Sequence, residues 1–314
     1  MLGADWTSYE GCVRAALATD IKLLDSINGS VLSNAGKQLR PIMSLLMSRA
    51  CGTVTGDSID YAAASELLHN ATLMHDDVAD QSSVRRGKPT LSASMGATVA
   101  VLVGDFWLSR AVGVVMGTAH QAEAVKLYAR TLSDLASGEM LQLQKAQTAD
   151  TTEEDYIRII YCKTASLFES ACRVAALSVD APEALCEAAG KYGAATGIAF
   201  QIRDDIFDYW DGPEIGKPVG IDLKEKKITL PLLGAMKNCG DEAAVRKMVL
   251  EIPGEPANCG RLQKFVRENG GLEYASRRLD DYINEALEAL EVLAPSPERE
   301  ALAALARYNA VRTQ

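Results

Sequence analysis

The sequence lacks the cysteine pattern of a zinc site or of a disulfide-bonded scaffold. Its seven cysteines, an odd number, are scattered from Cys12 to Cys259, and no two of them form a Cys-x-x-Cys pair. Reduced thiols fit this distribution better than a disulfide framework does. The first residues also lack the basic and apolar regions of a signal peptide. We therefore expect a cytoplasmic protein.

The chain has no excess of basic residues and no uninterrupted apolar run. A net charge of −10 argues against a nucleic-acid partner, because nucleic-acid binders carry a basic footprint. The most apolar stretch, residues 97–116, contains Asp105, Ser109 and Arg110. Charges near the middle of a segment disfavour membrane insertion. We expect no transmembrane segment, and a buried helix here because the stretch is apolar nearly all round.

Linker-like segments are also missing. Gly/Ser-rich tracts are absent and prolines are rare before residue 181, so one domain over residues 1–314 is expected. A chain of this length buries a sizeable core and leaves room for a cavity. Helical periodicity covers most of it, including residues 151–179 and 182–210, and no stretch reads as a convincing strand. Residues 212–229 form a charged Gly/Pro/Lys-rich loop, too long for a mere connection.

Two acidic motifs stand out in what is present. Asp76-Asp77-Val78-Ala79-Asp80 and Asp204-Asp205-Ile206-Phe207-Asp208 both read Asp-Asp-x-x-Asp within helical patterns. The first and last aspartates of each motif share a helix face, where like charges repel by about a few tenths of a kcal/mol. Mg²⁺ removes this repulsion and is usually shared with substrate phosphates. A solvated acidic face explains one such motif, but two motifs among apolar residues favour a polyanion held between metal ions.

Cations follow each acidic motif closely. Arg85, Arg86 and Lys88 come after the first motif, and the residues after the second are Lys217, Lys224, Lys226 and Lys227. Basic residues of this acidic chain are thus concentrated close to its two acidic motifs. Arginine offers phosphate oxygens a matching fork and lysine offers a point charge. The pattern predicts a diphosphate substrate.

Two weaker features lie upstream of these motifs. The Gly36–Pro41 stretch places Lys37 and Arg40 at the start of an apolar helix, which suits an anion-binding corner, although a solvated turn fits the same residues. His69 lies two turns before Asp76 on the same helix face, and both a structural and a ligand-binding role are open.

Taken together, these residues resemble the all-trans polyprenyl diphosphate synthases, the head-to-tail isoprenyl transferases, over nearly the whole chain. The stretches that carry the resemblance are residues 75–90, 200–208 and 216–231, Gly104-Asp105-Phe106 and Gly138-Glu139. The resemblance implies an all-α isoprenoid synthase fold. It implies a single large helical bundle of ten or more helices around a deep central cavity, with both acidic motifs at its mouth.

The resemblance also implies roles for individual residues. About three Mg²⁺ ions per active site are expected with substrate bound. Their principal ligands would be Asp76, Asp80 and Asp204, supported by Asp77, Asp205 and Asp208. The allylic diphosphate would be held by Arg85, Lys163, Lys217 and Lys227, and isopentenyl diphosphate by Lys37, Arg40, His69 and Arg86. The expected catalytic residues are Lys163, Thr164 and Gln201, of which Thr164 and Gln201 would turn oxygen atoms toward an allylic carbocation. The released diphosphate would take the proton.

Two departures from the family pattern affect this assignment. Ala35-Gly36-Lys37-Gln38 stands where Gly-Gly-Lys-Arg is usual, so the corner for isopentenyl diphosphate loses one cation. Glu225-Lys226-Lys227 stands where Glu-Gly-Lys is usual, which changes the stiffness of the loop and keeps Lys227.

The length of the product depends on the residues that line a tunnel beside the helix carrying Asp76. About one turn before Asp76 the chain has Ala71 and Thr72, both small, where short-chain members carry bulky aromatics. An open apolar tunnel predicts a medium or long all-trans product of roughly C30 to C50, for isoprenoid quinone biosynthesis. The alternative is that both residues simply face the core.

The expected function is therefore Mg²⁺-dependent condensation of isopentenyl diphosphate onto an allylic diphosphate. The alternatives are a shorter-chain (geranylgeranyl or farnesyl) diphosphate synthase, a non-catalytic subunit of a heteromeric synthase, and a terpene cyclase. A non-catalytic subunit is expected to lose carboxylates or cations, and a cyclase does not need the second full motif. We also expect a homodimer, because the helices around residues 96–147 offer more apolar surface than one core needs. Transient membrane contact is expected for product release.

Overall fold

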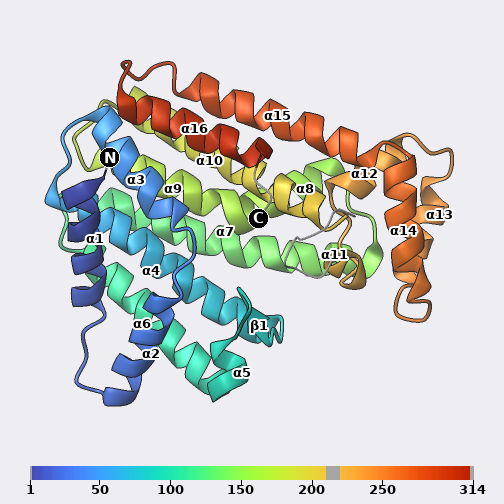
Figure 1. Ribbon diagram of the computed structural model, residues 1–314, viewed down its shortest axis with the longest axis horizontal. Coiled ribbons are helices and arrows are strands. Elements are labelled where there is room, and N and C mark those ends of the chain that lie inside the picture. Colours follow the sequence, from blue (N-terminus) through green and yellow to red (C-terminus); the bar gives the residue numbers. More distant parts are fainter. Residues whose placement is uncertain (1, 210–219, 312–314) are drawn as a thin grey trace. The chain divides into compact units, whose positions relative to one another are not determined.

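The computed structural model describes residues 2–209 and 220–311 (Figure 1). In this part of the chain, helices α1 to α16 and a π-helical turn form nearly all the regular structure, and strands β1 and β2 have two residues each. The prediction of an all-α protein with ten or more helices is confirmed. The described residues divide into two compact units. One domain over residues 1–314, built around a central cavity, stays a prediction.

Unit 1 takes in the described residues of Met1–Ala129, Ser170–Ala189 and Leu293–Arg299. Its own elements are α1 (Gly3–Ala16), α2 (Lys22–Ser33), α3 (Leu39–Cys51), α4 (Gly56–Ala79), β1 (Val84–Arg85), β2 (Lys88–Pro89), α5 (Leu91–Met95) and α6 (Ala97–Val115). The most extensive packing joins α4 to α6, which lie side by side in Figure 1, and α3 and α1 also pack on α4.

The helix that carries the first acidic motif, α4, begins with a capping box. The Thr55 hydroxyl accepts a hydrogen bond from the Ser58 N–H at 3.2 Å, and the Ser58 hydroxyl accepts one from the Thr55 N–H at 3.1 Å. Residues 61–68 are all buried, so this part of α4 is covered on every side. The helix ends at Ala79 with Asp80 as its C-cap. Its buried middle holds the acidic last turn in a fixed position.

Only one face of α6 is buried. The buried residues recur every three or four positions: Ala100, Val103, Gly104, Trp107, Ala111 and Val115. The opposite face leaves four large apolar side chains 38–62% exposed: Val101, Leu102, Val112 and Met116. The expectation of a helix buried all round is therefore wrong, because a uniformly apolar sequence does not mark which face packs. By length and composition α6 is apolar enough to cross a membrane, with 33% of its apolar window buried.

A short β-hairpin follows α4, although no stretch of the sequence read as a convincing strand. Val84 pairs with Pro89 and Arg85 with Lys88 in antiparallel register. The turn between the strands is Arg86-Gly87, with φ of 53° and 74°. Positive φ at both positions is the requirement of a type I′ hairpin turn. The hairpin was missed because strands of two residues have no alternating apolar pattern, and it presents Arg85, Arg86 and Lys88 from one tight turn.

Unit 2 takes in the described residues of Arg130–Glu169, Gly190–Val292 and Glu300–Gln314. Its own elements are α8 (Glu153–Ile160), the π-helical turn η1 (Tyr161–Ala165), α11 (Ile221–Lys224), α12 (Leu230–Lys237), α13 (Glu242–Leu250), α14 (Ala257–Glu268) and α15 (Gly271–Ala289). Four helices contribute residues to both units: α7 (Gln121–Thr148), α9 (Ser166–Leu177), α10 (Glu183–Phe207) and α16 (Pro297–Val311). In unit 2, α12 packs mainly on α15, and one apolar core cluster includes Ile198, Ile202 and Ile206 of α10.

Candidate active site

The first acidic motif occupies the end of α4. Asp76 is half-buried and Asp80 is exposed, whereas Asp77 is only 6% exposed. The Arg85 Nε donates to Asp77 Oδ1 at 2.7 Å, so this carboxylate anchors the hairpin. The last turn of α4, all of it described, contains no basic residue. Carboxylates at the negative end of a helix dipole cost about 0.3–1 kcal/mol each, so this helix end favours a bound cation.

The second acidic motif repeats this arrangement in unit 2. Asp204 and Asp205 lie in the last turn of α10, which is fully described and has no basic residue, and Asp208 follows directly. Asp208 accepts hydrogen bonds from the backbone N–H groups of Gly220, Ile221 and Asp222 at 3.0, 3.0 and 3.2 Å. Burial raises the pKa of Asp208, and these N–H groups oppose that rise. Asp208 thereby holds the start of α11 beside the end of α10.

The carboxylate pairs suit Mg²⁺ shared with a phosphate better than a closed metal cage. Within residues 2–209 and 220–311, no three Asp, Glu, His or Cys side chains converge as a preformed site. Mg²⁺ is commonly held by one or two carboxylates, several waters and substrate phosphate oxygens. The donor groups are carboxylate oxygens, which are the hard ligands that this ion prefers. The residues present therefore fit Mg²⁺.

An arginine-rich corner forms in unit 1 around Gly36. The Arg86 guanidinium lies so close to Gly36 that a Cβ there would stand 2.5 Å from Arg86 Cζ. Arg86 Nη1 donates to the Asn34 carbonyl at 3.0 Å, and Lys88 Nζ donates to the Asn34 side chain. Any side chain at position 36 would displace this guanidinium. Two cations of the hairpin thus bind Asn34 in the segment before α3.

Arg40 and His69 belong to the same corner. Burial lowers the pKa of Arg40 to about 10, with Arg86 lowering it further and Glu66 opposing. Burial lowers the pKa of His69 well below its usual value, and the charges of Arg40, Arg86 and Arg85 add to this effect. His69 is therefore neutral at pH 7. Cations that repel one another in a partly buried corner favour an anion-binding site over the solvated turn that the sequence left open. Lys37 is exposed.

Sequence reasoning missed one residue of this corner, Glu66. It is 4% exposed, and Asn70 Nδ2 donates to its Oε1 at 3.0 Å. A buried carboxylate needs such partners. The sequence did hold one signal for Glu66, because it is a charged residue within a run of apolar or small residues, one turn before His69.

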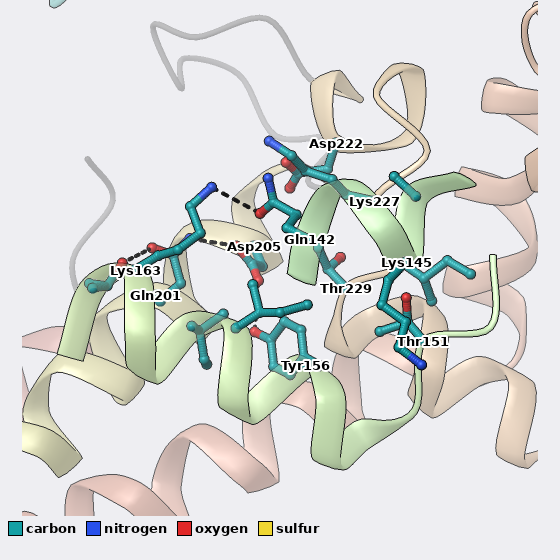
Figure 2. A pocket seen from close by; sticks show the side chains of 15 residues that line it. Gln142, Lys145, Thr151, Tyr156, Lys163, Gln201, Asp205, Asp222, Lys227 and Thr229 are labelled. Carbon is teal, nitrogen blue, oxygen red and sulfur yellow. Dashed lines mark hydrogen bonds between the residues drawn. The ribbon is translucent and has the colours of Figure 1, made fainter. Parts of the chain in front are cut away.

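A pocket of about 190 Å³ lies in unit 2 (Figure 2). Its walls come from α7, α8, η1, α10 and the segment 222–229. Of the expected site residues it contains Lys163, Thr164, Gln201, Asp205 and Lys227. Six polar lining residues were not predicted: Gln142, Lys145, Thr151, Tyr156, Asp222 and Thr229. Of these, burial raises the pKa of Asp222 to about 6, with Asp208 adding to the rise.

Lys163 and Thr164 lie on the π-helical turn η1, where an uninterrupted helix was expected. The Ser166 N–H bonds to the Tyr161 carbonyl, the long spacing of a π-helix, which occurs most often at functional sites. Glycines let neighbouring helices approach the turn. A Cβ on Gly138 of α7 would stand 2.6 Å from Cys162 Cβ, and one on Gly197 of α10 would stand 2.6 Å from Ala165 Cα.

The lysines of the pocket have acidic or amide partners. Lys163 Nζ donates to Gln142 Oε1 at 3.0 Å (Figure 2). It also pairs with Glu139. Lys227 Nζ lies 2.5 Å from Glu225 Oε2. The neighbouring Lys226 has φ of 58°, so the residue that replaces the usual glycine adopts a left-handed conformation. Lys217 lies outside the described residues.

Four side chains of the pocket form one hydrogen-bond chain. Tyr156 Oη donates to Asp205 Oδ2 at 2.7 Å, and Gln201 Nε2 donates to Asp205 Oδ1 at 2.8 Å. Thr164 Oγ1 donates to Gln201 Oε1 at 2.9 Å. Burial raises the pKa of Asp205 well above its usual range, with Asp222 as the next contribution. The structure therefore joins Thr164 to Gln201 and places Asp205 behind them.

The chain is all-α, and each of its acidic motifs lies at the end of a helix. Cations line the pocket and the arginine-rich corner. These features define the class of all-α prenyltransferases. The chain belongs to the polyprenyl synthetase family, whose model matches residues 21–267. The octaprenyl diphosphate synthase of Escherichia coli (strain K12) is 37% identical over 313 residues, 98% of this chain and 96% of the relative.

Solved structures agree over the whole chain. A crystal structure of a decaprenyl diphosphate synthase from Rhodobacter capsulatus has a TM-score of 0.93 at 32% identity, covering 100% of this chain and 97% of that one. A polyprenyl synthase from Caulobacter crescentus CB15, complexed with calcium and isoprenyl diphosphate, has a TM-score of 0.91 at 33% identity. That match covers 100% of this chain and 96% of the other.

Proposed function

We propose that the protein condenses isopentenyl diphosphate head-to-tail onto an allylic diphosphate in the cytoplasm, and that it requires Mg²⁺. The observation that carries the proposal is the pair of acidic helix ends, each accompanied by its own set of cations. The product is a medium or long all-trans polyprenyl diphosphate, roughly C30 to C50 and suited to a quinone side chain, because Ala71 and Thr72, about one turn before Asp76, are both small.

In this proposal the two diphosphates have separate sites. Asp76, Asp80 and Asp204 would hold Mg²⁺, which would supply positive charge for the oxygens of the departing diphosphate. Arg85, Lys163, Lys217 and Lys227 bind the allylic diphosphate, and Lys37, Arg40, His69 and Arg86 bind isopentenyl diphosphate. As the allylic carbon–oxygen bond breaks, Thr164 and Gln201 turn oxygen atoms toward the cationic carbon.

The condensation then needs only a base that accepts a proton. A carbon–carbon bond forms between the allylic carbon and the terminal alkene carbon of isopentenyl diphosphate, and a proton leaves the product. No carboxylate of the pocket is needed as the base, because the released diphosphate is an acceptor for that proton. The neutral His69 is suited to donating a hydrogen bond to a bound diphosphate.

The relatives support the metal and the product class. Calcium and isoprenyl diphosphate are together in the Caulobacter crescentus structure, which favours a divalent cation beside the diphosphate here. Octaprenyl and decaprenyl products are named for the Escherichia coli and Rhodobacter capsulatus relatives, and both fall in the proposed range. The exposed apolar face of α6 supports a homodimer, and transient membrane contact is proposed for product release.

The proposal is tested by incubating purified protein with labelled isopentenyl diphosphate, an allylic diphosphate and Mg²⁺. We expect label in a polyprenyl diphosphate whose chain is about C40, and no incorporation after chelation of the metal. Label in a cyclic hydrocarbon would favour a cyclase. No incorporation with any allylic diphosphate would favour a non-catalytic subunit, and a C15 or C20 product would contradict the proposed chain length.

A further inference from the structure

Asp205 is committed to protein partners on both of its oxygen atoms. It is 5% exposed, and Oδ2 and Oδ1 accept from Tyr156 Oη at 2.7 Å and from Gln201 Nε2 at 2.8 Å. Tyr156 is itself 3% exposed. Figure 2 shows these side chains within one wall of the pocket. The arrangement differs from the supporting metal role that the motif alone implies for Asp205.

The Asp205 carboxylate determines which end of the Gln201 amide faces the pocket. Both Asp205 oxygens accept hydrogen bonds here, and only the –NH₂ end of an amide can donate one, so this end of Gln201 faces Asp205. The Gln201 carbonyl oxygen then points the other way, where it accepts from Thr164 Oγ1 at 2.9 Å. The Thr164 hydroxyl donates its single proton in this hydrogen bond. Its remaining lone pairs are what the hydroxyl presents to the pocket.

We propose that Tyr156 and Asp205 are positioning residues that fix the polarity of Gln201 and Thr164. The inference rests on the proposed condensation, in which positive charge develops on the allylic carbon. With the observed polarity, that carbon meets oxygen lone pairs. With the amide reversed, Gln201 would donate to Thr164, and the Thr164 proton would turn toward the cation. Preoriented dipoles of this kind contribute strongly to catalysis because they need no reorganisation during the reaction.

A charge-conserving exchange separates this role from metal binding. Asp205→Asn leaves one acceptor oxygen at position 205 for two donors, Tyr156 Oη and Gln201 Nε2, and wherever the introduced –NH₂ group faces Gln201 the Gln201 amide reverses. When Asp205→Asn is combined with Gln201→Glu, the amide introduced at position 205 donates to the carboxylate introduced at position 201. The second oxygen of the carboxylate again accepts from Thr164. The double variant keeps the net charge and restores the acceptor, but it does not return a carboxylate to position 205.

The assay measures kcat, the KM for each diphosphate and the Mg²⁺ concentration for half-maximal rate. Asp205→Asn is expected to lower kcat about 100-fold, the scale of losing one oriented group. The double variant is expected to recover at least about tenfold of that loss, with the other constants within about threefold. A rise of about tenfold or more in the Mg²⁺ requirement of both variants, without recovery, would overturn the proposal and assign Asp205 to the metal.

Tyr156→Phe gives a second test that leaves every charge in place. We expect a lower kcat by about tenfold with the KM values unchanged, since Asp205 loses one of two donors. Tyr161→Phe is the matched control. The Tyr161 hydroxyl donates to Glu169 at 2.6 Å, and Tyr161 does not line this pocket. The kcat of Tyr161→Phe should therefore equal that of wild type. Equal kcat for Tyr156→Phe and wild type would overturn the inference, whereas an inactive wild type would contradict the proposed function itself.

Discussion

At the scale of single residues, the side chains just before the first acidic motif have the greatest influence on the product. Ala71 of α4 is fully buried, and Thr72 is half-buried on the same face as Asp76, one turn earlier. The Thr72 hydroxyl donates to the His69 carbonyl at 2.9 Å. Its proton is therefore used within the helix. Neither position fills space as an aromatic side chain does.

We predict that Ala71→Phe and Thr72→Phe shorten the product to roughly C15–C20 by steric exclusion. Chromatography of the dephosphorylated products measures this length, and Ala71→Ser is the matched control because it adds little volume. If the positions only face the core, the phenylalanine would instead overpack it at about 1–3 kcal/mol. The melting temperature would then fall while product length stayed the same, which would contradict the tunnel assignment.

The sequence pattern grouped several charged residues that the structure brings together, but it did not report their hydrogen-bond partners. Aspartates and arginines repeated at short spacing are visible as an electrostatic pattern, and the structure brings Arg40, His69 and Arg86 into one corner. Glu66 and Tyr156 were missed because their roles come from hydrogen bonds and charges that the local sequence pattern does not report. Spacing alone also grouped Asp205 with its neighbours, although its burial sets it apart.

At the scale of elements, the helices that carry the acidic motifs were predicted and local irregularities were not. Helical periodicity predicted both α4 and α10, and it placed an acidic motif in the last part of each helix. The π-helical turn η1 depends on the close approach of Gly138 and Gly197 from other helices, which no local pattern reports. The Arg86-Gly87 hairpin is too short for a strand signal. Both irregular elements carry cations of the proposed site.

The exposed face of α6 leads to a prediction about assembly. Leu102 is 62% exposed on that face, and covering it with a second copy of the chain would bury apolar surface. We predict that Leu102→Glu turns a homodimer into a monomer, measured by light scattering after size-exclusion chromatography. Leu23→Glu on α2 is the matched control, because Leu23 is 57% exposed and lies on another helix.

The contrary results for assembly are equally specific. A wild-type monomer in dilute solution would contradict the homodimer. A dimer that survives Leu102→Glu would place the interface elsewhere. Binding of wild type, but not of Leu102→Glu, to lipid vesicles in place of dimerisation would assign the α6 face to a membrane surface.

At the scale of the whole molecule, the chain supplies its two acidic motifs from two compact units. Each unit has an acidic helix end and cations of its own, the arginine corner in unit 1 and the lysine-lined pocket in unit 2. Their 128-residue separation in sequence and their repeated form led to the prediction that they serve one reaction. The family match over residues 21–267 includes both motifs. The central claim is that neither motif is sufficient alone.

The rate of isopentenyl diphosphate incorporation by Asp76→Ala and Asp204→Ala tests that claim most directly. We predict that each variant, at saturating Mg²⁺, loses at least about a thousandfold in rate, or roughly 4 kcal/mol of transition-state stabilisation, because each removes a principal metal ligand. Circular dichroism should remain helical in both, and the exposed Asp20→Ala should match wild type. A rate within about threefold of wild type for either variant would contradict the account.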